Sequence, residues 1–250
     1  ITGGTFYGSV TDCKIDDRAT FSVTFDTGGG SAVDTQRVLR GQKAEKPADP
    51  VKDGWRFTGW HSDGKEYDFT EPVTADTVLT ANWMSTTTRE VSTAEELTAA
   101  LSGTDGIVKL AANIDFSGTL TVTRTVTLDL NGFTLKFTNP EQVPITTYGR
   151  VNSHTENFPI GILVKSQDIQ SVHLTLADSS EAATGRLEMT GVNDNAIFVA
   201  DGELTMTGGT ITNSYSGEIG YVLMTGIAIL RGTAAMTGGR IENQKQMGVW

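Results

Sequence analysis

The sequence is poor in cysteine, in long apolar runs and in positive charge. A single cysteine, Cys13, cannot close an internal disulfide, so a disulfide-stapled scaffold is excluded. The uninterrupted apolar stretches are only a few residues long, which is too short to span a bilayer. Lys and Arg number 19 against 30 Asp and Glu, which gives a formal net charge of −11. That balance disfavours nucleic acid and anionic membranes as partners.

Glycine and threonine are abundant instead, and nearly the same ten residues occur twice. LTMTGGTITN at 204–213 returns as AAMTGGRIEN at 234–243, about 30 positions later. In each copy, short runs alternate apolar with polar residues, and glycine or asparagine separates the runs, which is typical of strands and turns. In the first copy the predicted strands are 196–200, 203–207 and 210–212, with turns at Asp201-Gly202, Gly208-Gly209 and Asn213.

Three strands and three turns per repeat are what one rung of a parallel β-helix requires. The chain would wind round a triangle, so that each side pairs with the same side of the next rung and similar turn residues stack. Leu187 aligns with Leu204 at a spacing of about 17 residues, which predicts a short minimal rung and an excursion at 214–225. Further rungs are predicted from 126–135, 161–164, 172–176, 187–191 and 247–250.

The run VTLDLNGFTL at 126–135 and the MTGGTITN-type rungs are frequent in one group of solenoids. On these motifs residues 90–250 resemble the pectate-lyase-like right-handed parallel β-helix superfamily, a resemblance that is more specific for fold than for function. Residues 92–101, STAEELTAAL, are typical of the helix that caps such a solenoid. Ser92 is the expected N-cap, and Glu95 completes a capping box.

Residues 21–83 have a different pattern and form a separate module. Its motifs are VTFDTGGG at 23–30, KPADP at 46–50, GWRFTGW at 54–60 and LTANW at 79–83. On these motifs the module resembles the Listeria–Bacteroides repeat, the B-repeat type of the internalins. The resemblance implies a small β-grasp-like fold that occurs in cell-surface proteins as a spacer or interaction module, without known catalysis. Three tryptophans are expected to lie in its core: Trp55, Trp60 and Trp83.

The expected fold class is therefore mainly β, in two different modules. ITGGTF at 1–6 resembles the rung corner MTGGTI at 206–211, so the first residues are either a linker or the end of an upstream β-helical segment. The sequence starts at Ile1 and reaches Trp250 as a rung begins, so we expect a piece of a longer protein with further rungs. The predicted parts are 1–20, the linker or upstream segment; 21–84, the Listeria–Bacteroides module; and 85–250, a truncated parallel β-helix with a short capping helix.

A search for catalytic and metal-binding patterns finds none of the expected signatures. A polysaccharide lyase needs acidic calcium ligands and a basic residue, and a hydrolase needs two carboxylates. Glu188 and Glu203 come nearest to a stacked pair but are one residue out of register, and Asp129 is isolated in its strand. We expect these acids to be solvated outer-face charges, with His173 also facing outward. The three histidines lack metal-ligand spacing, so we predict no catalytic residue, metal or cofactor.

The candidate ligand-binding residues lie in two excursions from the rungs, 139–160 and 214–225. Loops carry function on repetitive scaffolds, because stacking fixes the faces of the scaffold itself. Tyrosine among Asn, Arg and Ser is usual where a protein contacts carbohydrate, because the ring covers a sugar face. The alternative is that these loops only pack over the solenoid, with the tyrosines as local plugs. The candidate residues are Tyr148, Arg150, His154, Tyr215 and Tyr221.

These observations predict a non-catalytic fragment of a bacterial protein that is secreted or attached to the cell surface. Its expected role is adhesion or presentation of a binding surface, with a glycan or a host or matrix protein as partner. The near-absence of cysteine fits a Gram-positive surface protein, although it also fits the cytoplasm. The alternatives are a polysaccharide lyase or hydrolase with active rungs outside the fragment, and a purely structural stalk. The oligomeric state stays open.

Overall fold

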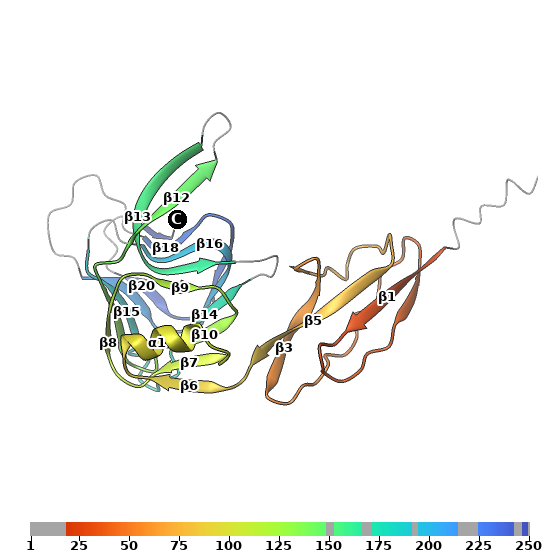
Figure 1. Ribbon diagram of the computed structural model, residues 1–250, viewed down its shortest axis with the longest axis horizontal. Coiled ribbons are helices and arrows are strands. Elements are labelled where there is room, and N and C mark those ends of the chain that lie inside the picture. The colour runs from red at the N-terminus through yellow and green to blue at the C-terminus, as the bar shows by residue number, and fades with distance from the viewer. Residues whose placement is uncertain are drawn as a thin grey trace, which may run out of the picture. The chain divides into compact units, whose positions relative to one another are not determined.

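The chain divides into two compact units, residues 1–83 and 84–250. Both are built mainly from strands, and the described part of the chain holds one helix (Figure 1). That helix has eight residues and is too short to cross a membrane. Residues 1–18, for which two interpretations stayed open, lie outside the described residues. The computed structural model describes residues 19–148, 153–166, 172–191, 195–214, 225–242 and 247–249.

The first unit is a five-stranded sheet with the strand order β2-β1-β5-β3-β4. β1 pairs antiparallel with β2 and parallel with β5, so the first and last strands of the unit lie side by side inside the sheet. Alternation along β1 buries Val23 and Phe25 in the core. The small β domain expected from the sequence is confirmed. Its strands are β1 (Thr20–Asp26), β2 (Gln36–Leu39), β3 (Trp55–Ser62), β4 (Lys65–Glu66) and β5 (Thr77–Ser85).

The three tryptophans of this unit have different environments. Trp60 is 1% exposed and makes edge contacts with Phe25 and Phe57 at ring-centroid distances of 4.9 and 5.3 Å. Trp83 packs half-buried against the same core, and its Nε1–H donates to the carbonyl of Thr27 at 2.9 Å. Trp55 is 40% exposed, so the prediction that all three lie in the core is wrong for this residue. The reason is local, because Trp55 begins β3 directly after a tight turn.

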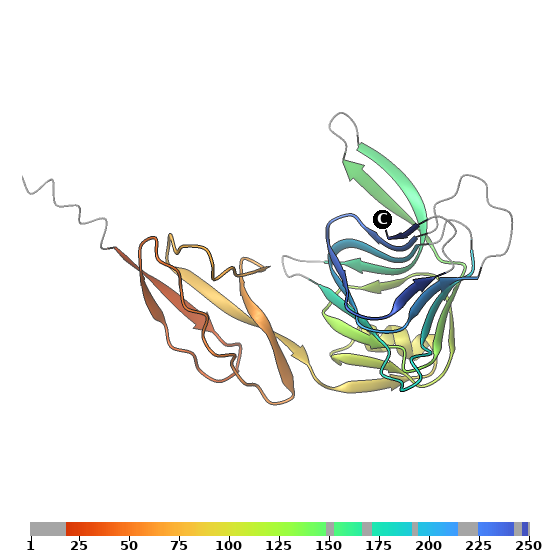
Figure 2. The same ribbon diagram turned by 180° about the vertical axis from the view of Figure 1, so that it is seen from behind.

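The second unit winds as a solenoid with three sides, which the chain visits in a fixed order. Successive turns pair in parallel on every side and form a curled parallel sheet, which fits the predicted β-helix (Figure 2). Side one contains β6 (Thr88–Val91), β7 (Ile107–Leu110), β10 (Val126–Asp129), β14 (His173–Ala177), the second half of β16 (Asn195–Met206) and β19 (Gly232–Met236). Side two contains β8 (Ile114–Ser117), β11 (Thr134–Thr138), β15 (Arg186–Met189), β17 (Thr210–Asn213) and β20 (Arg240–Glu242). Side three contains β9 (Leu120–Val122), β13 (Ser153–Lys165), the first half of β16, β18 (Thr225–Ile229) and β21 (Met247–Val249).

The sequence repeat corresponds to one full turn of this solenoid. Leu204 pairs with Ala234 on side one, and Ile211 pairs with Ile241 on side two, each thirty positions further along the chain. Leu187, however, pairs with Ile211 and not with Leu204, so the predicted rung of about 17 residues is wrong. Strands of sides one and two share the same alternating pattern, and sequence alone therefore matched a strand of side two to one of side one.

Two other details of the predicted rungs are corrected by the pairing. Asp201-Gly202 is not a break between strands, because β16 continues through this corner and joins side three to side one. The rung at 247–250 was placed on the correct side, but Val249 is the residue that pairs with Ile227, so its register is shifted by one. Backbone continuity through the corner depends on Gly202, which has φ = +134°.

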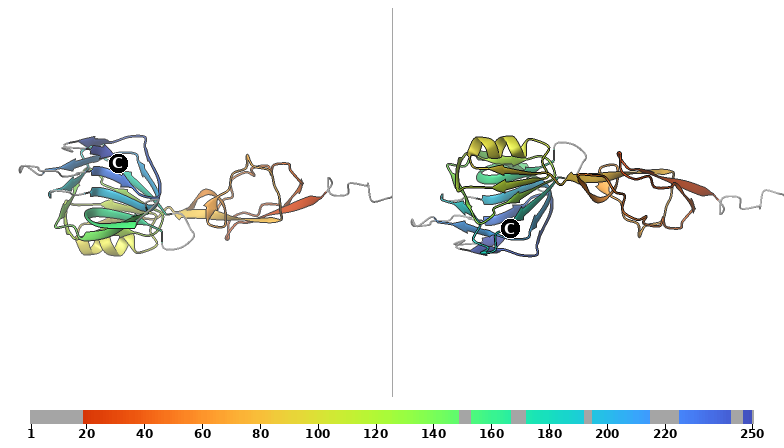
Figure 3. Two further views of the ribbon diagram at one scale, coloured as in Figure 1. Left: turned by 90° about the horizontal axis from the view of Figure 1, so that it is seen from above. Right: turned by 90° about the horizontal axis from the view of Figure 1, so that it is seen from below.

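Helix α1 (Ala94–Leu101) covers the first turn of the solenoid (Figure 3). Its N-cap is Thr93, whose Oγ1 accepts from the backbone N–H of Glu96 at 3.2 Å. The Glu96 carboxylate in turn accepts from the backbone N–H of Ser92 at 2.8 Å, so the predicted Ser92–Glu95 box is shifted by one residue. The two overlapping Ser/Thr–Glu pairs are equivalent in sequence, and the face that must be buried selects between them. That face carries Leu97, Ala100 and Leu101.

Substituting Thr93 with alanine is expected to destabilise the solenoid by about 1 kcal/mol, because the Glu96 N–H loses its acceptor. The matched control is Thr98→Ala. The Thr98 hydroxyl donates to the carbonyl of Ala94 inside the helix, and alanine has the higher helix propensity. The control is therefore expected to change stability by less than about 0.5 kcal/mol. Urea denaturation measures both variants, and equal losses would contradict the assignment of Thr93 as the cap.

Candidate functional site

The excursion at 139–160 is a β-hairpin and not a loop. β12 (Gln142–Tyr148) pairs antiparallel with the first half of β13, from Gln142↔Pro159 to Tyr148↔Ser153. The second half of β13 then continues into side three, where it pairs with β9 and β16. Figure 1 shows the hairpin projecting from the body of the solenoid. One continuous strand therefore connects the projecting element with the scaffold.

A separate apolar cluster joins the base of this hairpin to the outer face of side three. Ile162 and Val164 point into the main core, whereas Leu163, between them, belongs to the separate cluster. Phe198 and Ala228 occupy the same position on the next two turns and are 3% and 0% exposed. On these three turns side three is consequently apolar on both faces, as the uninterrupted apolar runs at 162–164 and 196–199 require. From the hairpin the cluster takes Ile145 and Ile160, with Val143 and Phe158 packed against it.

Two of the five predicted ligand-binding residues lie in the described backbone of this hairpin. Tyr148 pairs with Ser153, and His154 pairs with Thr147, so the two residues occupy neighbouring positions at its outer end. Closer to the base, the hydroxyls of Thr146 and Thr155 hydrogen-bond across the hairpin at 2.8 Å. The other three predicted residues, Arg150, Tyr215 and Tyr221, lie outside the described residues. Most of the excursion at 214–225 also lies outside them.

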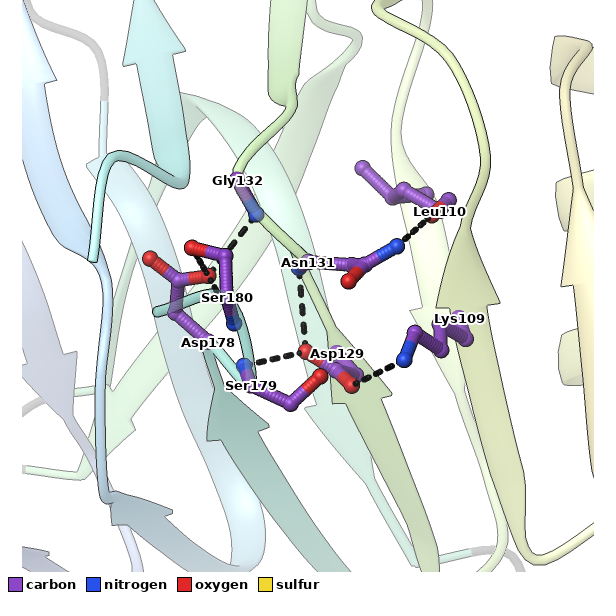
Figure 4. A network of polar contacts seen from close by, with 8 residues as sticks. All are labelled: Lys109, Leu110, Asp129, Asn131, Gly132, Asp178, Ser179 and Ser180. Carbon is purple, nitrogen blue, oxygen red and sulfur yellow. Dashed lines mark hydrogen bonds and ion pairs between the residues drawn. The ribbon is translucent and has the colours of Figure 1, made fainter. Parts of the chain in front are cut away.

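Asp129, expected to be a solvated charge, is instead buried at a corner of the solenoid (Figure 4). Its Oδ1 accepts from the backbone N–H of Asn131 at 3.0 Å and from that of Ser179 at 2.8 Å. Its Oδ2 lies 4.0 Å from the ammonium of Lys109 on the preceding turn. The expectation was wrong because Asp129 ends β10, where backbone N–H groups of two turns converge on one carboxylate.

Asp178 is the centre of a second set of contacts at this corner, and sequence reasoning missed it. Its Oδ1 accepts from Gly132 N at 2.8 Å and from the hydroxyl of Ser180 at 2.8 Å, and its Oδ2 accepts from Gly185 N at 2.7 Å. Partial burial alone would raise the pKa of Asp178, but the hydrogen bonds from Ser180, Gly185 and Gly132 together lower it. Asp-Ser-Ser after a strand was the available signal, because aspartate and serine favour such turns. We name the contacts of Asp129 and Asp178 the corner network.

The remaining acids singled out from the sequence are paired across turns of the solenoid. Glu188 lies 3.9 Å from the ammonium of Lys136 on side two. Glu203 lies 3.5 Å from Nδ1 of His173 on side one, so the two glutamates lie on different sides of the solenoid. His173 faces outward as predicted, and its Nε2 contacts the hydroxyl of Thr205 at 2.8 Å. Within the described ranges no group of three or more His, Cys, Asp or Glu side chains could hold a metal ion.

In the first unit, a lysine is held between two tryptophans. The ammonium of Lys52 lies 4.8 Å from the ring centroid of Trp55 and 5.7 Å from that of Trp83. It also donates to the carbonyl of Gly28 at 2.9 Å. These contacts orient the exposed Trp55 ring by cation–π attraction. The arrangement stabilises a surface turn.

Comparison with known proteins identifies the first unit. Residues 21–82 match the model of the Listeria-Bacteroides repeat domain, as the sequence motifs predicted. A search of the curated proteins found no relative of the chain. The match covers about a quarter of the sequence, and the pectate-lyase-like assignment of the second unit stays a prediction that its curled parallel sheet fits.

Proposed function

Because residues 21–82 form a Listeria-Bacteroides repeat domain, a domain that occurs in bacterial surface proteins, we propose that the chain is a non-catalytic binding protein of the bacterial exterior. In this proposal the solenoid displays the β12–β13 hairpin, and the hairpin contacts a glycan or a host or matrix protein. The repeat domain serves as a spacer or a second interaction module. The observation that carries the proposal is the hairpin itself, a projecting element anchored by its own apolar cluster.

The length of the insertion supports this role. Leu128 pairs with Val108, so a plain turn of the solenoid needs about 20 residues. Ile162 pairs with Leu120, so the turn that carries the hairpin uses about twice that number. The additional residues form paired strands whose base is buried, although stacking of the turns does not require them. Insertions on repeat scaffolds map to the face that binds partners.

The state of the acids supports a role without catalysis. A glycosidase needs one carboxyl group as the acid and a second as nucleophile or base, close to the same bond. Asp129 and Asp178 are instead occupied by backbone N–H groups, and Glu188 is paired with a lysine. Groups that satisfy buried donors cannot leave them without exposing unpaired N–H groups, which costs stability. The acids of the corner network therefore act in folding.

The proposal is tested on a broad glycan array and a panel of matrix proteins, with the whole chain as probe. Specific binding is expected, and the double variant Tyr148→Ala/His154→Ala is expected to weaken it at least about tenfold, the effect of losing a contact residue at a binding hot spot. Trp55→Ala is the matched control, because it removes an exposed aromatic side chain from the other unit.

Each outcome of this experiment decides between the remaining functions. Glycan binding lost in the double variant supports a lectin-like hairpin, and the same loss for a matrix protein identifies a protein partner. Binding that persists in the double variant but disappears in the control moves the site to the repeat domain. Absence of binding on both surfaces would contradict the proposal and leave a structural stalk. Circular dichroism of each variant excludes loss of folding as the cause.

A further inference from the structure

Asn131-Gly132 is the one Asn-Gly pair in the sequence, and it forms the corner between β10 and β11. We propose that Asn131 is prone to spontaneous deamidation and that the corner network slows this reaction. Asp178 is the residue that restrains the attacking nitrogen. The proposal does not depend on the function proposed above. It follows from the reactivity of Asn-Gly, in which glycine offers no side chain to hinder attack by its own nitrogen.

The reaction that must be prevented is an intramolecular cyclisation. The backbone nitrogen of Gly132 attacks Cγ of Asn131, a new N–Cγ bond forms, and the bond between Cγ and the amide nitrogen Nδ2 breaks. Ammonia leaves with the proton from the Gly132 nitrogen, and the product is a five-membered succinimide. Water then opens the ring to aspartate or isoaspartate, so that in sum an oxygen from water replaces the amide nitrogen.

The attacking nitrogen is held by a carboxylate from the next turn of the solenoid. Gly132 N donates to Oδ1 of Asp178 at 2.8 Å (Figure 4). To attack, this nitrogen must lose its proton and rotate toward the Asn131 side chain. The hydrogen bond opposes the rotation, and the negative charge of Asp178 opposes formation of an anionic nitrogen beside it.

The electrophile is held by the preceding turn. Nδ2 of Asn131 donates to the carbonyl of Leu110 at 2.9 Å, and the backbone N–H of Asn131 donates to Asp129 at 3.0 Å. Phe133 N donates to the carbonyl of Leu130 at 2.8 Å, which closes a two-residue turn. Both central residues have positive φ, +47° and +82°, as in a type I′ turn. Contacts to the preceding and the following turn of the solenoid thus hold the Asn131 side chain and the Gly132 nitrogen apart.

The consequences of the reaction make the site relevant to the solenoid as a whole. Aspartate at 131 would place a third carboxylate beside Asp129 and Asp178, and like charges in such proximity repel. Isoaspartate would add a methylene to the backbone at the corner and shift β11 against β8 and β15. Either product weakens the corner network, so one deamidation event favours further opening of the same corner.

The test follows deamidation at Asn131 by peptide mass mapping of the whole chain during incubation at mildly alkaline pH. A synthetic peptide of residues 126–137 is the unprotected reference. The folded wild type is expected to react at least about tenfold more slowly than the peptide, because cyclisation requires local opening. Asn139 is an internal control, since it has φ = +50° but precedes Pro140, which has no N–H to lose.

Variants separate the effect of Asp178 from that of folding in general. Asp178→Ala is expected to raise the rate toward that of the peptide, whereas Ser179→Ala, which changes an exposed neighbour, should behave as wild type. Hydrogen exchange of the β11 peptide shows whether each variant remains folded. Should Asp178→Ala unfold, Asp178→Asn decides: its amide oxygen can still accept from Gly132 N, but the negative charge is lost, so the rate is expected to lie between that of the wild type and that of the peptide. A folded wild type that deamidates as fast as the peptide, or a folded Asp178 variant without the predicted effect, would overturn the proposal.

Discussion

Replacing Trp60 with alanine is expected to destabilise the Listeria-Bacteroides repeat domain by about 3–5 kcal/mol, the usual cost of emptying a large buried site. Trp60 is 1% exposed and joins Phe25 and Phe57 in one aromatic cluster. A domain of roughly 60 residues holds only about 3–9 kcal/mol in total. The substitution is therefore expected to remove most of the stability of this unit.

Hydrogen exchange of the whole chain measures this effect separately for each unit. Peptides from β1 and β3 are expected to lose protection in Trp60→Ala, while peptides from β10 and β11 keep it. Trp55→Ala is the matched control, and it should cost at most about 1 kcal/mol, since it removes a half-exposed ring and one cation–π contact. Comparable losses of protection in the two variants would contradict the distinction between a buried and a surface tryptophan.

Replacing Gly202 with alanine is expected to destabilise the solenoid by roughly 3 kcal/mol or more, because two costs coincide. Gly202 has φ = +134°, a conformation that residues with a side chain rarely adopt. A Cβ at this position would also lie 2.6 Å from the carbonyl oxygen of Val172. That oxygen accepts the backbone hydrogen bond of Glu203 at 2.7 Å, so relief of the clash would break a pairing between turns.

Gly103→Ala in the same unit is the matched control for this substitution. Gly103 lacks a positive φ, and its added Cβ would lie 3.3 Å from the carbonyl oxygen of Ala99. Its effect on the free energy of unfolding is expected to stay within about 1 kcal/mol. Urea denaturation compares the two variants. A Gly202→Ala protein as stable as the control would show that the side-three to side-one corner tolerates a side chain.

The sequence was sufficient to predict the elements whose signals are local. Alternation identified the strand at 173–177, Asn131-Gly132 identified a corner, and the tryptophan and glycine motifs identified the repeat domain. It was insufficient for choices between equivalent patterns. Leu187 was matched to the wrong side because sides one and two alternate in the same way, and the helix cap was misplaced because two Ser/Thr–Glu pairs overlap.

The candidate site was harder to predict, for a different physical reason. The partners of Asp129 and Asp178 lie up to 50 positions away and meet only after the turns have stacked. The hairpin was predicted as a loop because β12 contains Pro144 and several polar residues. Proline is tolerated in β12 because this strand is at the edge of its sheet. Ile145 of the hairpin is buried against Leu163, Phe198 and Ala228 on the outer face of side three. No local sequence pattern relates these residues to the hairpin.

In the proposed function the β12–β13 hairpin, and not an acid-lined face of the solenoid, contacts the ligand. The most direct measurement is hydrogen exchange of the whole chain with and without the tightest-binding glycan or matrix protein found in the screen. Added protection is expected to concentrate in peptides covering 142–158. Protection concentrated on side one or side two, around Glu203 or Glu188, with the hairpin unchanged, would contradict it.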